Sequence, residues 1–222
     1  MKTALVSCLY LDGNDDQGNN RIDRNIRYVE YYEKIKKDIG FDDIILGDNC
    51  SSAESMRKFK EGIGINNSVK IHVFDKHIPR KGIFEYGYAW RMLHYFRELI
   101  QDGYEKIITI DSDGYILTKR LANYVNNCNE GWEAFWCAKY NFPEAAFHIL
   151  NKDQFNFFLG YTSVPWERMN GIGAMELALP FTKVNKDFNT DRYGEDSIIQ
   201  SPDWDYVGQT PLQMNLTFNK EN

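Results

Sequence analysis

Residues 106–114 read Lys-Ile-Ile-Thr-Ile-Asp-Ser-Asp-Gly. This apolar run is rich in β-branched residues and lies between Gly103 and Gly114, so it predicts a buried strand that ends at two carboxylates. Ligands bind at the carboxyl ends of strands in open α/β sheets. Alternation along an extended chain would send Asp111 and Asp113 to the same side, where both could bind one hard cation. A strand followed by an ordinary Asp-Gly turn explains the same residues without a ligand.

The chain before this stretch alternates between strand patterns and helix patterns. Strands are predicted at 2–11, 43–46 and 69–74, and helices at 24–39, from residue 51 onward and at 83–100. Because each strand is followed by a helix, the order predicts an α/β fold. Its sheet should be Rossmann-like, mostly parallel and sandwiched by helices.

The second half of the chain is less regular. A helix is predicted at 117–125 and a strand at 133–140. From about residue 141 the alternation fades into an irregular, aromatic-rich C-terminal part, in which residues 192–198 are expected to open another helix. The length of 222 residues nevertheless fits one domain, 1–222.

The composition argues against several classes of partner. A net charge of −6 leaves no basic footprint for nucleic acid, and no stretch approaches the length of a membrane span. The cysteines Cys8, Cys50, Cys128 and Cys137 show no metal-ligand spacing. We therefore expect reduced thiols in a cytoplasmic protein.

Several short motifs elsewhere carry polar groups suited to chemistry. Asp48 follows the second predicted strand, where it could accept hydrogen bonds from a nucleotide or help to cap a helix. Gly194-Glu195-Asp196 places two carboxylates at a predicted helix start, whose dipole favours an ionised general base. The segment Asn170-Gly171-Ile172-Gly173 suits close approach of the backbone to a ligand, or a tight turn. The basic loop 75–82 and Arg91 could face a diphosphate or solvent.

Taken in order over residues 2–200, these motifs resemble the glycosyltransferase family A fold, the nucleotide-diphospho-sugar transferases. The resemblance implies a nucleotide-binding half, 1–114, and an acceptor-side half, 115–222. It implies donor contacts from Leu9, Tyr10, Asp48, Arg91, Asp111, Ser112 and Asp113. The sugar and acceptor pocket would include Trp166, Asn170, Gly171 and Gly173.

The same resemblance implies a reaction. A sugar would move from a nucleotide-diphosphate donor to an acceptor hydroxyl, with inversion at the anomeric carbon. Asp111 and Asp113 would hold Mn²⁺ or Mg²⁺ together with the donor diphosphate. Asp196, beside Glu195, would be the general base. A glycan, a lipid-linked molecule or a small molecule could be the acceptor.

The chain departs from this family at the proposed metal site. Many members use a late histidine as a further metal ligand, but no histidine follows His148 in this sequence. Asp203, Asp205 or water would then have to take its place.

Two other functions fit some of the same residues. The segment 107–114 also resembles the opening motif of haloacid-dehalogenase-like phosphatases, in which Asp111 would be a nucleophile and Asp113 a general acid/base. That motif usually lies near the start of the chain, and its usual threonine is Tyr115 here. A non-catalytic nucleotide- or sugar-binding domain would keep the same acidic motifs.

Overall fold

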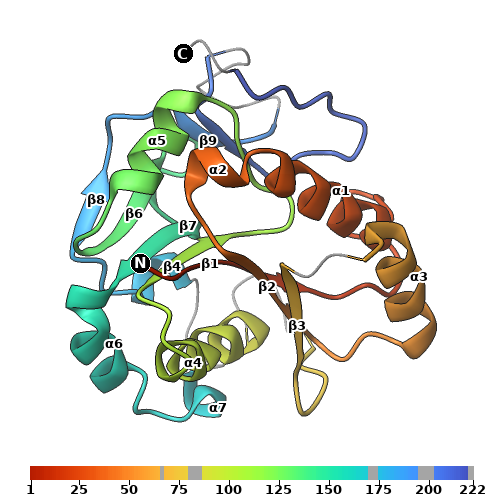
Figure 1. Cartoon of the computed structure of the whole chain (residues 1–222), viewed down its shortest axis with the longest axis horizontal. Coiled ribbons are helices and arrows are strands. Elements are labelled where there is room, and N and C mark those ends of the chain that lie inside the picture. Colours follow the sequence, from red (N-terminus) through yellow and green to blue (C-terminus); the bar gives the residue numbers. More distant parts are fainter. Residues whose placement is uncertain (66–67, 80–86, 170–174, 195–202, 220–222) are drawn as a thin grey trace.

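The computed structural model describes residues 1–65, 68–79, 87–169, 175–194 and 203–219. These residues form an α/β structure around a seven-stranded sheet (Figure 1). In spatial order the strands are β3 (Val69–Val73), β2 (Asp43–Asp48), β1 (Thr3–Leu9), β4 (Lys106–Ile110), β7 (Phe142–Asn151), β6 (Trp132–Cys137) and β8 (Lys183–Asn185).

The main sheet is mostly parallel, as predicted. β3, β2, β1 and β4 run in one direction. β7 is antiparallel to both β4 and β6, whereas β8 is parallel to β6. A second sheet has the order β5 (Tyr115–Ile116), β10 (Tyr206–Gly208) and β9 (Thr190–Arg192).

Helices cover both faces of the main sheet (Figure 1). On one face lie α1 (Arg21–Lys34), α2 (Lys36–Ile39), α3 (Ala53–Ile63) and α5 (Lys119–Asn127). On the other lie α4 (Gly87–Gln101), the 3₁₀ turn η1 (Lys152–Gln154), α6 (Phe155–Tyr161), α7 (Trp166–Met169) and α8 (Met175–Ala178). β1 serves both cores, because Leu5 and Leu9 pack on one side while Ala4 and Val6 pack on the other.

Capping residues explain where several helices begin and end. The side chain of Asn20 accepts hydrogen bonds from two backbone N–H groups in the first turn of α1, and Ser52 does the same for one in α3. Gly40, at φ +78°, ends α2 in the left-handed region that favours glycine. The single helix predicted over 24–39 is divided at Ile35 into α1 and α2.

The prediction of an irregular segment from residue 141 was wrong for β7. This strand has 10 residues and lies inside the sheet between β4 and β6. Its polar residues Glu144, His148 and Asn151 are buried, so they interrupt the apolar pattern that marks a strand in the sequence. The helix expected at 192–198 is also wrong at its start, because Arg192 ends strand β9, while residues 195–198 lie outside the described residues.

Two expectations from composition can be compared with the structure. None of the helices in the described part of the chain is long and apolar enough to cross a membrane. All four cysteines are free thiols.

Candidate functional site

A cavity of about 730 Å³ opens where β1 and β4 end. Its size falls in the range of roughly 300–1,000 Å³ that is typical of ligand sites. The walls come from the segments after β1, β2, β3 and β4, from α1 and α4, and from β7, α8, β9 and β10. The carboxyl edge of the parallel strands therefore faces this cavity, as the strand order leads one to expect.

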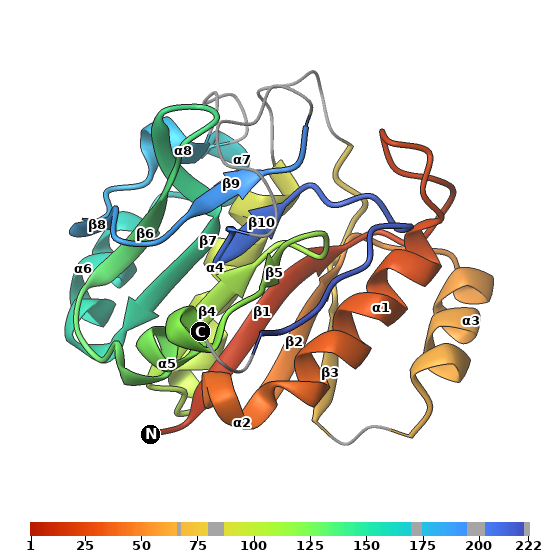
Figure 2. The same ribbon diagram turned by 90° about the horizontal axis from the view of Figure 1, so that it is seen from above.

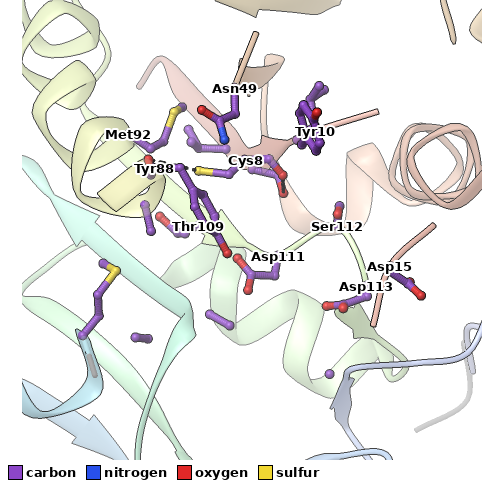
Figure 3. A pocket seen from close by; sticks show the side chains of 18 of the residues that line it. Cys8, Tyr10, Asp15, Asn49, Tyr88, Met92, Thr109, Asp111, Ser112 and Asp113 are labelled. Carbon is purple, nitrogen blue, oxygen red and sulfur yellow. Dashed lines mark hydrogen bonds between the residues drawn. The ribbon is translucent and has the colours of Figure 1, made fainter. Parts of the chain in front are cut away.

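The two aspartates predicted as a pair both line the cavity (Figure 3). The backbone N–H of Gly114 donates to the carbonyl of Asp111 at 2.8 Å, so Asp111 to Gly114 form a turn. The expectation that an extended backbone brings the two carboxylates together was wrong, and the turn does so instead. An added Cβ on Gly114 would lie 2.2 Å from the hydroxyl of Tyr206, so this turn needs glycine.

The carboxyl of Asp111 is in an environment that disfavours its charge. It reaches the water of the cavity, but surrounding protein atoms desolvate it, and the carboxylates of Asp113 and Glu144 add repulsion. Together these effects raise the pKa of Asp111 to about 8, although the guanidinium groups of Arg192 and Arg24 act in the opposite direction. A cation bound here would relieve the repulsion.

Arg24 on α1 connects Asp113 to the loop after β1. Its Nη1 lies 3.0 Å from Asp15 Oδ2 and 3.8 Å from Asp113 Oδ2. The Nε of Arg24 is buried without a hydrogen-bond partner. Because 3.8 Å is too long for a hydrogen bond, the oxygens of Asp113 keep their coordinating capacity.

The donor atoms at this end fit a divalent cation that is shared with a ligand. Among the described residues, five carboxylates and three guanidinium groups line the cavity: Asp15, Asp16, Asp111, Asp113 and Glu176 against Arg21, Arg24 and Arg192. The described residues contain no group of three or more histidine, cysteine, aspartate or glutamate side chains arranged around one metal position. Asp111 and Asp113 could thus supply two ligands, and phosphate oxygens or water would supply the others.

An aromatic wall lies at the end of the cavity formed by the segments after β1 and β3. The ring of Tyr10 lies 5.0 Å from the ring of His77, and the guanidinium of Arg21 lies 5.3 Å from the centre of the Tyr10 ring. His77 Nδ1 forms a 2.9 Å hydrogen bond with the carbonyl of Asn49. Leu9 and Tyr10, both predicted to lie near the donor, line this wall. Flat rings and a cation suit a planar, polar group such as a nucleobase.

Asp48 is placed differently from its predicted role. Its carboxylate is buried and accepts hydrogen bonds from the backbone N–H and the hydroxyl of Ser51. Burial raises the pKa of Asp48 although these hydrogen bonds oppose the change. Asn49, the next residue, lines the cavity instead, and the contacts of Asp48 are local ones with Ser51, just before the Ser52 cap of α3.

Of the other predicted residues, Ser112 lines the cavity, two lie away from its lining, and the rest are outside the described residues. Arg91 on α4 lies 3.7 Å from Asp75, and Trp166 on α7 lies under the Lys76 ammonium at 5.1 Å. Ser112 lines the cavity beside the two aspartates. Asn170, Gly171, Gly173, Glu195 and Asp196 lie outside the described residues.

Asp205, one possible substitute for a late histidine ligand, is engaged elsewhere. It is buried and accepts a 2.6 Å hydrogen bond from the hydroxyl of Thr118. It also accepts hydrogen bonds from the guanidinium of Arg120 and from the backbone N–H of Asn189, at 2.9 Å for the latter. These contacts join β10 to α5, and they leave Asp205 out of the cavity lining.

The sequence analysis missed an ion-pair cluster on the opposite wall. Arg192 at the end of β9 donates to both carboxylate oxygens of Glu144, at 2.7 and 2.5 Å, and to Glu176 at 3.1 Å. Burial disfavours the charge of Arg192, but Glu144 and Glu176 outweigh it and raise the pKa of the guanidinium. No sequence signal joins residues 48 positions apart, so only the fold reveals this pair.

Comparison with known proteins supports the fold. No protein-family profile and no curated protein matches the sequence. A glycosyltransferase involved in the glycosylation of the major capsid of PBCV-1 superposes with a TM-score of 0.50 at 11% identity, over 96% of this chain and 95% of that one. HddC from Yersinia pseudotuberculosis gives 0.50 at 12% identity, over 82% of this chain and 89% of that one. The chain therefore has a glycosyltransferase A-like fold, as the order of its motifs predicted.

Proposed function

We propose that this chain is a glycosyltransferase that moves a sugar from a nucleotide-diphosphate donor to an acceptor hydroxyl. The observation that carries the proposal is the placement of Asp111 and Asp113 together in a cavity at the ends of β1 and β4. The similar fold of a known glycosyltransferase supports the same function.

The donor would lie along the edge of the sheet. Its base would stack against Tyr10, and Arg21 could neutralise part of the diphosphate charge. Asp113 and Asp111 would hold Mn²⁺ or Mg²⁺, which neutralises charge on the departing phosphate when it is bound. The carboxylate excess in the cavity would otherwise repel a diphosphate, so the proposal includes metal dependence.

The acceptor side of the proposal rests on the motifs of the sequence. Asp196, with Glu195 beside it, would take the acceptor proton as the sugar is transferred with inversion. Asn170, Gly171 and Gly173 would lie against the sugar or the acceptor. If Asp196→Asn kept near-normal turnover with intact donor binding, a retaining reaction would be the better proposal.

Donor binding tests this function directly. Calorimetric titration with UDP, GDP and CDP, with and without Mn²⁺, should find one nucleotide that binds at least about tenfold more tightly with the metal. Asp113→Asn should abolish that metal effect because it removes one anionic ligand. Asp102→Asn is the matched control, since Asp102 is exposed beyond the far end of α4. Hydrolysis of an aryl phosphate that Asp111→Asn abolishes would contradict the proposal and favour a phosphatase.

A further inference from the structure

A cluster of aromatic side chains lies beside the cavity, at the turn between β6 and β7. The rings of Tyr140 and Phe142 are parallel within 10°, with their centroids 5.7 Å apart. Tyr140 is 41% exposed, and Tyr193, just after β9, is 46% exposed. We call Tyr140 and Phe142 the aromatic platform. Figure 2 shows the β6–β7 turn and the end of β9 at the same edge of the molecule as the segment after β1.

Buried contacts hold the aromatic platform in place. The carboxylate of Asp191, which is 1% exposed, accepts hydrogen bonds from the backbone N–H groups of Lys139 and Arg192, at 2.9 and 2.8 Å. Asp191 therefore fastens the turn that carries Tyr140 to the strand that precedes Tyr193. The Lys139 ammonium also donates to the carbonyl of Tyr193 at 3.4 Å. A surface fixed in this way loses little conformational freedom when a ligand binds.

Arg192 makes the platform continuous with the cavity. Its guanidinium lies 5.0 Å from the centre of the Tyr140 ring and also lines the cavity. The same guanidinium is hydrogen-bonded to Glu144 and Glu176. A ligand on the platform would therefore meet the exposed Tyr140 ring and the half-buried Phe142 ring. The Arg192 guanidinium and the Lys139 ammonium, which lies 5.5 Å from the centre of the Tyr140 ring, would stand at its edge, next to the proposed donor site.

This combination fits the two surfaces of a sugar ring. One face of a pyranose presents C–H groups, which pack on the negative face of an aromatic ring, and its rim presents hydroxyls that need polar partners. A lipid chain would instead require an extended apolar surface without charges. We propose that the aromatic platform binds a pyranose ring of the acceptor, so that the acceptor is a carbohydrate. This inference rests on the proposed glycosyltransferase function.

Direct binding of saccharides tests the platform without requiring turnover. Maltose, cellobiose and lactose are offered to the full chain, with the best-binding nucleoside diphosphate and Mn²⁺ present, and binding is followed by saturation-transfer NMR. We expect at least one disaccharide to bind through its ring C–H protons. Tyr140→Ala should weaken that binding about threefold to tenfold, since it removes one aromatic contact, whereas Tyr140→Phe should retain it.

The control and the donor titration separate the possible failures. Phe157→Ala removes another exposed ring, 47% accessible, on α6, and should leave saccharide binding unchanged. If donor nucleotide binds with metal but none of the disaccharides binds, or Tyr140→Ala binds as well as the unaltered chain, the platform inference is wrong while the transferase proposal stands. Failure of donor binding itself would instead overturn the proposed function.

Discussion

Two arginines on opposite walls of the cavity hold their carboxylates in different ways. Arg192 is bound to both oxygens of Glu144, at 2.7 and 2.5 Å, and Glu144 is 2% exposed. Arg24 instead lies between Asp15 and Asp113, at 3.0 and 3.8 Å, and its Nε has no hydrogen-bond partner. The first pair is complete, and the second shares one arginine between two acids. We infer that Arg192 has a structural role in holding the cavity wall, whereas Arg24 leaves Asp113 able to bind another cation.

The largest expected effect comes from breaking the complete pair. Glu144→Ala would leave the largely buried guanidinium of Arg192 with Glu176 as its remaining carboxylate partner among the described residues. Removing one partner of a buried ion pair costs about 3–5 kcal/mol, so the free energy of unfolding in urea should fall by an amount near that range. Glu54→Ala, which breaks an exposed ion pair on α3, should lower the free energy of unfolding far less than Glu144→Ala, because solvent screens that pair.

A double variant distinguishes ion pairing from loss of packing. Glu144→Leu with Arg192→Leu removes both charges, so it should destabilise the protein by less than the two single changes added together. Strict additivity of the three unfolding free energies would contradict the structural role assigned to this pair.

The acidic end of the cavity should make stability depend on pH. The pKa of Asp111 is raised to about 8, so the folded state holds this proton more tightly than the unfolded state, whose carboxyl titrates near its ordinary value of about 4. The contribution of Asp111 to stability is therefore present below about pH 4 and is lost as the pH rises toward 8. Urea unfolding at pH 5 and pH 8 should show a larger loss for the unaltered chain than for Asp111→Asn.

The size of this effect is limited by water in the cavity. Asp111 reaches solvent, which screens its repulsion by Asp113 and Glu144, so we expect about 1 kcal/mol or less between the two pH values. Mn²⁺ should recover part of the loss at pH 8 in the unaltered chain but little in Asp111→Asn. Equal pH dependence of the unfolding free energy in the two proteins would show that folding does not raise the pKa of Asp111.

The sequence predicts the first half of the fold because β1, β2 and β4 are buried on both faces. Continuous apolar runs identify β1 and β4, and Asp111 and Asp113 then follow from the position of ligands at strand ends. The same pattern does not predict β7, because the buried residues Glu144 and His148 are polar and interrupt its apolar run. Their partners lie far away in the sequence, so the local pattern resembles an exposed segment.

The placement of Asp48 also depends on a contact that the sequence pattern does not reveal. Asp48 and Asn49 both follow the apolar part of β2, and the sequence does not tell which of the two side chains turns toward the cavity. The contacts of Ser51 determine which side chain faces the cavity. Its backbone N–H and hydroxyl donate to the buried Asp48 carboxylate, and Asn49 lines the cavity. The turn at Gly114 likewise depends on Tyr206, which is 92 residues away and approaches too closely for any Cβ.

The smallest expected effect concerns the shared arginine. Arg24→Met removes a positive charge 3.8 Å from Asp113, and two charges at that distance interact by about 1 kcal/mol even with the full screening of water. Binding of Mn²⁺ alone, measured by calorimetry at pH 8, should therefore become about threefold to fivefold tighter. Arg57→Met on α3 is the matched control, because this exposed arginine pairs only with Glu54 and Glu61 among the described ion pairs. Weaker Mn²⁺ binding in Arg24→Met would mean that Arg24 orients the Asp113 carboxylate for the metal. Arg24 would then not compete with Mn²⁺ for Asp113, and the two arginines would differ only in the geometry of their contacts.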